Sequence, residues 1–288
     1  MGASPGVVAW IWFLRVISVV NIALWVRMAA QFQRESPLQG PELRLYRRRQ
    51  LLLAALFVGG CAFRSIFPRA DVQRIVLFDS WISVVAIGRS VATVAEMAFM
   101  AQWALLIGES SGPGQRDVAR VVSRVLVPLI AIAELCSWYA VITTNYLGNA
   151  VEQSIWTFTS ALVIVGLVAR ERGARQRFVG IAVSLIGAYI VFMCMVDIPM
   201  YLHRWVADEG AGRQYFSFLA GLHDAATRLV VTRQWEPWRE EIPWMSLYFS
   251  TGVWVSLWLT RAAPARRSSA VTLGDRNVAG SSLSKARS

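Results

Sequence analysis

The chain has 288 residues, of which 56% are hydrophobic and 16% charged, and its formal net charge at pH 7 is +11. Soluble domains carry about 25% charged residues, so the composition indicates a polytopic membrane protein with no length left for a separate soluble domain. The positive charge lies mainly in short segments between apolar stretches, which argues against nucleic-acid binding.

Seven apolar segments follow one another along the chain, and about 20 residues suffice to cross a bilayer. The first is too long for a signal-peptide core and is followed by no small-residue cleavage pattern, which predicts a retained span. The third must tilt or project from the bilayer because it runs to about 30 residues. We therefore expect an all-α integral membrane protein, a bundle of seven transmembrane helices within residues 1–261. The expected spans are 7–30, 51–67, 77–107, 121–144, 154–168, 178–201 and 243–260.

The charges of the connections predict the orientation. The connection after the first segment contains the run Arg47, Arg48 and Arg49, and arginines also follow the third and fifth segments and the last one. By contrast, residues 147–153 contain no basic side chain, and residues 204–241 contain five arginines against six acids. Because basic connections stay in the cytoplasm, we expect the N-terminus outside and the C-terminus in the cytoplasm.

Two regions outside the spans have their own patterns. In the outer loop, 204–242, Phe216, Leu219, Leu222 and Ala226 share one helical stripe, which predicts an amphipathic helix on the outer membrane interface. A lid over an outward-facing cavity is the alternative. Residues 262–288 are rich in Ser, Ala, Gly and Arg, which predicts a disordered basic cytoplasmic tail.

Charged residues inside the apolar segments are the main functional signal. A charge at membrane depth costs roughly 2.5–3.5 kcal/mol even on lenient insertion scales, so such residues pair in the interior or line a wet cavity. Three arginines and three acids occur there, balanced in sign: Arg15, Arg64, Arg89, Glu96, Glu134 and Asp197.

Helical spacing places several of these residues on common faces. Arg89 and Glu96 are seven apart, and Glu134, Trp138 and Asn145 also share a face. Other polar residues fall in the outer half of the spans or near it, including Glu152 in the expected turn between the fourth and fifth spans. We infer a polar pocket that opens outward and narrows toward Glu96 and Glu134, although the same residues could be structural ion pairs. The candidates for ligand or proton binding are Arg64, Arg69, Asp79, Arg89, Glu96, Glu134, Trp138, Asn145 and Asp197.

The residue inventory also excludes several chemistries. The only histidines, His203 and His223, lie at or beyond the outer boundary, which excludes bis-histidine haem in the bilayer and argues against a metal site. The three cysteines show no CxxC spacing, and no GxSxG motif or Gly-rich phosphate loop occurs. We expect no cofactor and identify no family motif.

Three functional interpretations remain. In the first, the protein binds or transports a small solute or anionic lipid headgroup, with the carboxylates carrying coupling protons. In the second, it is an intramembrane enzyme acting on a lipid or isoprenoid substrate, so enzymatic activity stays open. In the third, it is a non-catalytic sensor or membrane-complex subunit. The expected partners are the lipid bilayer and a small-molecule or lipid ligand.

Overall fold

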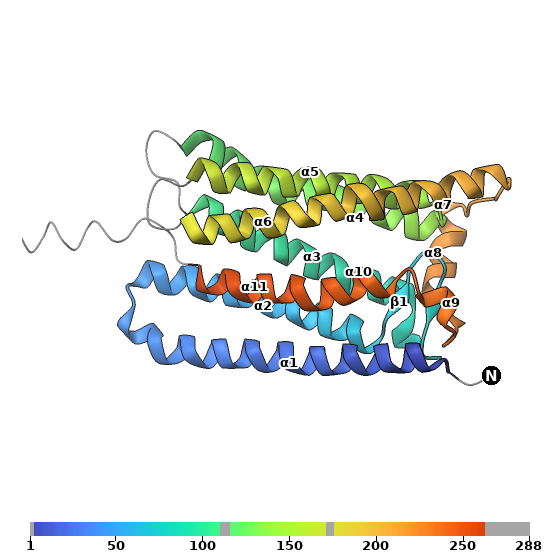
Figure 1. The fold of residues 1–288 in the computed structure, drawn as a ribbon, viewed down its shortest axis with the longest axis horizontal. Helices are drawn as coiled ribbons and strands as arrows, with labels where there is room; N and C mark the ends of the chain where they lie inside the picture. The colour runs from blue at the N-terminus through green and yellow to red at the C-terminus, as the bar shows by residue number, and fades with distance from the viewer. Residues whose placement is uncertain (1–2, 110–115, 171–175, 263–288) are drawn as a thin grey trace, which may run out of the picture.

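The protein is an integral, multi-pass membrane protein built as a bundle of long helices (Figure 1). The computed structural model describes residues 3–109, 116–170 and 176–262, so the expected tail beyond Ala262 lies outside the described residues. Within them, six helical runs are long and apolar enough to cross a bilayer. They are Pro5–Leu38, Pro41–Ile66, Val85–Gly108, Val118–Thr143, Tyr146–Ala169 and Arg177–Gly210.

The long helices follow the chain order of the expected spans. α1 is Pro5–Glu35, which the 3₁₀ turn η1 (Ser36–Leu38) joins to α2, Pro41–Ile66. The next three are α3 (Val85–Gly108), α4 (Arg116–Thr143) and α5 (Tyr146–Arg170). α6 (Gln176–Phe192) continues through the π-helical turn η3 (Met193–Asp197) into α7 (Ile198–Gly210).

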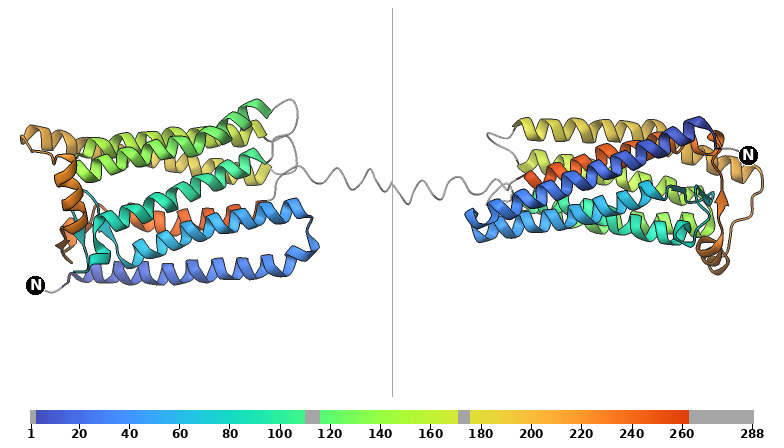
Figure 2. Two further views of the ribbon diagram at one scale, coloured as in Figure 1. Left: turned by 180° about the vertical axis from the view of Figure 1, so that it is seen from behind. Right: turned by 90° about the horizontal axis from the view of Figure 1, so that it is seen from below.

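A last helical run returns along the bundle. It consists of α10 (Ile242–Leu247), the π-helical turn η4 (Tyr248–Gly252) and α11 (Val253–Arg261), and it packs mainly against α2 (Figures 1 and 2). Asn21 attaches α1 to this run, because its Nδ2 donates to the carbonyl of Phe249 at 2.7 Å and its Oδ1 accepts from Trp254 at 3.1 Å. The run coincides with the expected span 243–260 but is not among the six selected by length and hydropathy.

The helices begin and end away from several expected span boundaries. α5 begins at Tyr146 rather than at Ser154, because Asn145 Oδ1 accepts from the backbone N–H of Leu147 at 2.9 Å and caps the helix. Conversely, residues 77–84 are not part of α3 but form a connection with the 3₁₀ turn η2, Trp81–Ser83. Hydropathy detects apolar stretches, whereas hydrogen bonding and caps decide where a helix ends.

A small cap covers one end of the bundle, the end at which α1 begins (Figure 1). It contains β1 (Arg69–Ala70), β2 (Ile75–Val76), β3 (Val230–Val231), α8 (Phe218–Thr227) and α9 (Trp235–Trp238). β1 pairs antiparallel with β2, with Arg69 opposite Val76, and β2 pairs parallel with β3, with Ile75 opposite Val230.

Arg74 connects the cap to the bundle through hydrogen bonds. Its backbone has φ 60° in the turn between β1 and β2. Its buried guanidinium donates to Asp224 of α8 at 2.8 Å, to the carbonyl of Asp71 at 2.7 Å and to the carbonyl of Val141 near the end of α4 at 2.8 Å. One side chain therefore holds the strands, α8 and α4 together.

The expected outer helix is formed as α8, with its small residues toward the bundle. Gly221 and Ala225 are buried, and a Cβ on Gly221 would lie 1.9 Å from the carbonyl oxygen of Ile142. The predicted stripe faces the other way, with Leu219 77% and Leu222 40% exposed. α8 thus presents an apolar surface to its surroundings.

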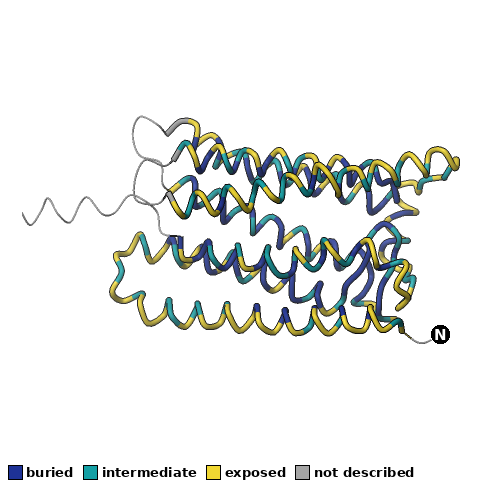
Figure 3. Tube along the Cα trace, viewed as in Figure 1, coloured by how far each residue is buried: buried dark blue, intermediate teal, exposed yellow. Residues whose placement is uncertain are grey.

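Burial is highest in the centre of the bundle and low on α1 and on the run through α6 and α7 (Figure 3). One apolar cluster contains Met100, Leu126 and Val163 of α3, α4 and α5, and a second contains Leu14 and Phe57 of α1 and α2. Many apolar side chains of α1 are exposed, as a helix in contact with lipid requires. α3 contacts α2, α4, α5, α8 and α11, and its side chains Arg89, Glu96 and Gln102 are buried.

Candidate functional site: a buried arginine–carboxylate network

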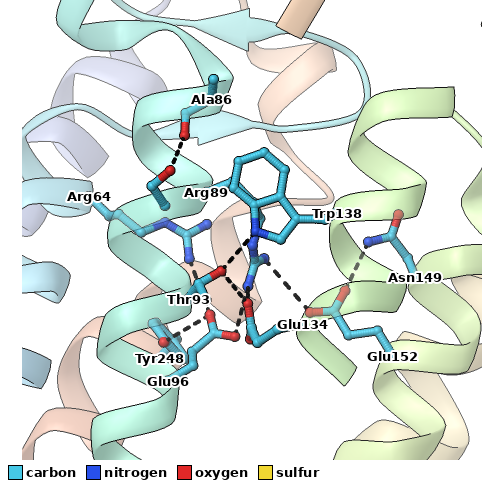
Figure 4. A network of polar contacts seen from close by, with 11 residues as sticks. Arg64, Ala86, Arg89, Thr93, Glu96, Glu134, Trp138, Asn149, Glu152 and Tyr248 are labelled. Carbon is cyan, nitrogen blue, oxygen red and sulfur yellow. Dashed lines mark hydrogen bonds and ion pairs between the residues drawn. The ribbon is translucent and has the colours of Figure 1, made fainter. Parts of the chain in front are cut away.

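Five charged side chains from four helices meet inside the bundle (Figure 4). They are 3–6% exposed, and we call them the carboxylate network: Arg64 of α2, Arg89 and Glu96 of α3, Glu134 of α4 and Glu152 of α5. Glu96 follows Arg89 by seven positions, about two helical turns, so both side chains lie on the same face of α3.

Arg89 is the centre of the carboxylate network. Its Nη2 donates to Glu134 Oε2 at 2.7 Å and to Glu96 Oε2 at 2.9 Å. Its Nη1 lies 3.7 Å from Glu152 Oε1. One guanidinium therefore connects α3, α4 and α5, and buried charge-assisted contacts of this kind are stronger than neutral hydrogen bonds.

Neutral donors hold the carboxylates in place. Thr93 donates to Glu134 Oε2 at 2.5 Å, and the indole of Trp138 donates to Thr93 at 3.2 Å. Tyr248, in the π-helical turn η4, donates to Glu96 Oε1 at 3.2 Å. Asn149, one turn before Glu152 on α5, donates to that carboxylate at 3.1 Å. Each carboxylate thus has at least one donor besides an arginine.

Arg64 joins the network more loosely. Its Nη1 lies 3.6 Å from Glu96 Oε1, which is an ion pair beyond ordinary hydrogen-bond distance. Its guanidinium also lies about 6 Å from the ring centroids of Trp244, Tyr248 and Phe249. Aromatic faces attract cations at this range, so the rings support the charge that Glu96 only partly balances.

The formal charges of the network do not cancel. Three carboxylates face two guanidiniums, which leaves one negative charge. One oxygen of each of the three carboxylates lies within 4.8 Å of the others, a spacing that could also hold a metal ion. Arg89 Nη2, however, already donates to the carboxylates of Glu96 and Glu134, so a cationic side chain is present among the three acids. Glu134 Oε1 and Arg89 Nε are enclosed and have no hydrogen-bond partner among the residues that the structure describes.

The structure brings together only part of the set predicted from the sequence. Arg64, Arg89, Glu96 and Glu134 are in the network, and Trp138 reaches it through Thr93. Arg15 is half-buried on α1, with its guanidinium 5.3 Å from the Trp12 ring. The remaining candidates have other surroundings: Arg69, Asp79, Asn145 and Asp197.

Arg69 is a buried residue of the cap. It donates to the carbonyls of Val84 at 2.9 Å and Phe67 at 3.0 Å, and it lies where a Cβ of Gly88 would be, so a larger residue at position 88 of α3 would displace the Arg69 guanidinium. Burial lowers the pKa of Arg69 to about 10, partly opposed by Asp71 and assisted by Arg64.

The other three candidates each lie in a different environment, apart from the carboxylate network. Asp79 is exposed in the connection before α3. Asn145 caps α5. Asp197 is buried in the π-helical turn η3, and its charged neighbours are Arg204 and Glu241. These two form an ion pair at 3.3 Å, separate from the carboxylate network.

Two features of the interior were not predicted from the sequence. Glu152 lies inside α5 and not in a turn, and the spacing of Asn149 and Glu152 on one helical face was the available signal. A second polar cluster lies toward the other end of the bundle, where Gln50 and Gln102 donate to each other's backbone carbonyls at 3.0 and 3.3 Å. Ser256 of α11 donates to Gln102 Oε1 at 2.5 Å, so this cluster links three helices.

The expected outward-facing pocket is not open at the carboxylate network. Its side chains are almost fully buried, and α8 packs against α3 and α4 at the cap end of the bundle. An apolar groove of about 350 Å³ lies between α4, α5 and α7, and a cavity of about 320 Å³ lies at the opposite end of the bundle; no network residue lines either one. The cap and the tight ion pairs account for the difference, because helical periodicity shows faces but not what covers them.

Comparison with protein-family models, curated proteins and solved structures finds no match to this chain.

Proposed function

We propose that the chain crosses the membrane seven times, with its N-terminus outside and its C-terminus in the cytoplasm. The run α10–α11 supports a seventh crossing because it extends along α2 within the bundle (Figure 2). The end of the bundle opposite the cap contains the run Arg47, Arg48 and Arg49, and α11 ends there at Arg261. These basic residues support a cytoplasmic location for that end. Tags at the two termini should be accessible from opposite sides of sealed vesicles. Accessibility from the same side would exclude an odd number of crossings.

We further propose that the carboxylate network binds a proton and couples it to the binding or transport of a small solute or anionic lipid headgroup. The observation that carries this proposal is the excess of one carboxylate over the guanidiniums in a buried cluster. An unbalanced charge is costly in a low-dielectric interior, and adjacent carboxylates disfavour each other's ionisation. Binding one proton makes the cluster neutral, and releasing it would weaken the closed arrangement.

Infrared difference spectroscopy on the purified protein tests for this proton directly. At pH 7 the wild type should show the carbonyl stretch of a buried, protonated carboxylic acid. Glu→Gln changes at Glu96, Glu134 and Glu152 identify the acid that carries the proton, and Glu236→Gln is the control because that side chain is 74% exposed. Absence of the band in the wild type would contradict the proposal. A band unaffected by all three network changes would place the proton elsewhere.

A second test addresses the coupling to a solute. Small anionic solutes and lipid headgroup analogues are added to the detergent-solubilised protein, and thermal stability is followed at two pH values. A true ligand should stabilise the wild type to a pH-dependent extent, because it binds one protonation state better than the other. Stabilisation that is independent of pH would separate ligand binding from the proton and contradict the coupling.

A non-catalytic sensor or complex subunit is the second candidate function, and the closed network favours it. Such a protein needs the ion pairs only to fix the relative positions of α2, α3, α4 and α5. It would bind no solute in the second test. The proposal of an intramembrane enzyme draws less support, because the groove between α4, α5 and α7 is lined mainly by apolar side chains and contains no carboxylate or arginine.

A further inference from the structure

A cavity at the end of the bundle opposite the cap has a composition that suits an amphiphile. It has a volume of about 320 Å³ and lies between the end of α1, the beginning of α2 and the end of α11. We call it the arginine pocket. Its lining consists of Met28, Gln31, Phe32, Glu35, Arg47, Leu51, Thr260 and Arg261.

Polar and apolar groups are separated along the depth of the arginine pocket. Glu35 and Arg261 are the last residues of α1 and α11, so charges surround the pocket at the end of the bundle. Met28 lies two turns before Glu35, and Leu51 lies one turn after Arg47, so apolar side chains line the part nearer the bilayer centre. This order matches the order of headgroup and hydrocarbon in a lipid.

The charge of the arginine pocket is positive and incompletely balanced. Arg47 pairs with Glu35 at 2.8 Å, whose side chain is 55% exposed. Arg261 donates to a neutral acceptor, Gln31 Oε1, at 3.2 Å. The lining therefore carries two arginines and one carboxylate, and no carboxylate pairs with Arg261 within the part of the chain that the structure describes. Arg34, Arg44 and Arg48 are exposed nearby and add positive charge.

We infer that the arginine pocket binds an anionic phospholipid of the adjacent leaflet. The phosphate lies between Arg47 and Arg261, which come from different helices, and one acyl chain lies along Met28, Phe32 and Leu51. Arginine suits this role because its planar set of N–H donors matches phosphate oxygens. Basic pockets between transmembrane helices bind anionic headgroups in this way. No residue of the carboxylate network lines the pocket, so this inference stands apart from the proposed proton site.

Native mass spectrometry of the full chain, titrated with phosphatidylglycerol or phosphatidylcholine, tests the inference. Phosphatidylglycerol should bind more tightly than phosphatidylcholine. The double change Arg47→Gln with Arg261→Gln should weaken the binding of phosphatidylglycerol by about 30-fold, which is about 2 kcal/mol, because it removes both charge-assisted contacts with the phosphate. Equal binding of the two lipids, or an unchanged affinity in the double variant, would overturn the inference.

Two further variants separate the pocket from general surface charge. Arg34→Gln removes an exposed arginine at the same end that does not line the pocket, and it should change the affinity less than twofold. If Arg34→Gln lowered the affinity for phosphatidylglycerol as much as the double variant does, the lipid would be held only by the general positive charge of this end and not by the arginine pocket. Glu35→Gln should tighten lipid binding, because it frees Arg47 from its partner. This gain cannot result from misfolding, and a loss of affinity would contradict the assignment.

The lipid chain is tested separately from the phosphate. Leu51→Trp fills the apolar part of the arginine pocket and leaves both arginines in place. It should weaken the binding of phosphatidylglycerol. Inorganic phosphate at millimolar concentration should not compete with the lipid, since it lacks the chain. Full competition by phosphate would show that the pocket is a site for a soluble anion and would overturn the lipid assignment.

Discussion

Arg89 and Glu134 form the shortest ion pair of the carboxylate network, with Arg89 Nη2 2.7 Å from Glu134 Oε2, and they join α3 to α4 inside the bundle. The same nitrogen contacts Glu96, so the position of one guanidinium fixes two carboxylates.

Arg89→Leu should be strongly destabilising. It would leave three carboxylates facing Arg64 alone, and removing one partner of a buried pair costs about 3–5 kcal/mol. Thermal or denaturant unfolding in detergent measures the effect. Arg15→Leu is the matched control, since it removes a half-buried arginine outside the network. A loss at position 89 no larger than the loss at position 15 would show that the network does not stabilise the fold.

Replacing different carboxylates should have unequal effects. Glu152→Gln replaces the carboxyl group farthest from Arg89, 3.7 Å away, by a neutral amide, and it should change the unfolding free energy by less than about 1 kcal/mol. Glu134→Gln also removes one charge, but it loses the contacts with Arg89 and Thr93 and should cost about 2–3 kcal/mol. The comparison uses unfolding in one detergent at pH 7. The reverse order would contradict our expectation that Glu152, which has the longest contact with Arg89, contributes least to the fold.

Gly221→Ala should displace α8 from the bundle. The new methyl group would lie 1.9 Å from the carbonyl oxygen of Ile142, and overpacking of this kind costs roughly 1–3 kcal/mol. Limited proteolysis of the cap should therefore become faster. Gly210→Ala is the control, because no atom lies within 4 Å of its added Cβ. Equal proteolysis of the two variants would indicate that α8 is not packed on α4.

The contact between α7 and the segment before α10 should be sensitive to acid. Arg204 donates to Glu240, and this hydrogen bond lowers the pKa of the Glu240 carboxyl below its ordinary value of 4.5. A depressed pKa contributes stability above that ordinary value, and the contribution is lost as the pH falls through the lowered value. Glu240→Gln should therefore lower stability at pH 7 but narrow the difference between pH 7 and pH 3. Thermal unfolding at both values checks this, with Glu236→Gln as the control on the neighbouring short helix α9.

The sequence by itself determined that this is a helical, multi-pass membrane protein and which side chains carry charge at membrane depth. Both follow from local properties, because a run of apolar residues and a spacing of seven along one helix need no knowledge of neighbouring helices. Arg89 and Glu96 could be assigned to one face in this way. The amphipathic helix α8 could also be expected from its own periodicity.

Only the tertiary structure decided which of those charges meet. The sequence places both Asp197 and Glu152 in or near the same half of a predicted span, yet Glu152 lies beside Arg89 and Asp197 lies near Arg204. The difference depends on where α5 begins and on how α5 and α7 are rotated about their axes. The same packing places Tyr248 on Glu96 and closes the cap over the network. Such contacts join residues far apart in the chain, and their geometry is fixed by the packing of helices against one another, which no local pattern records.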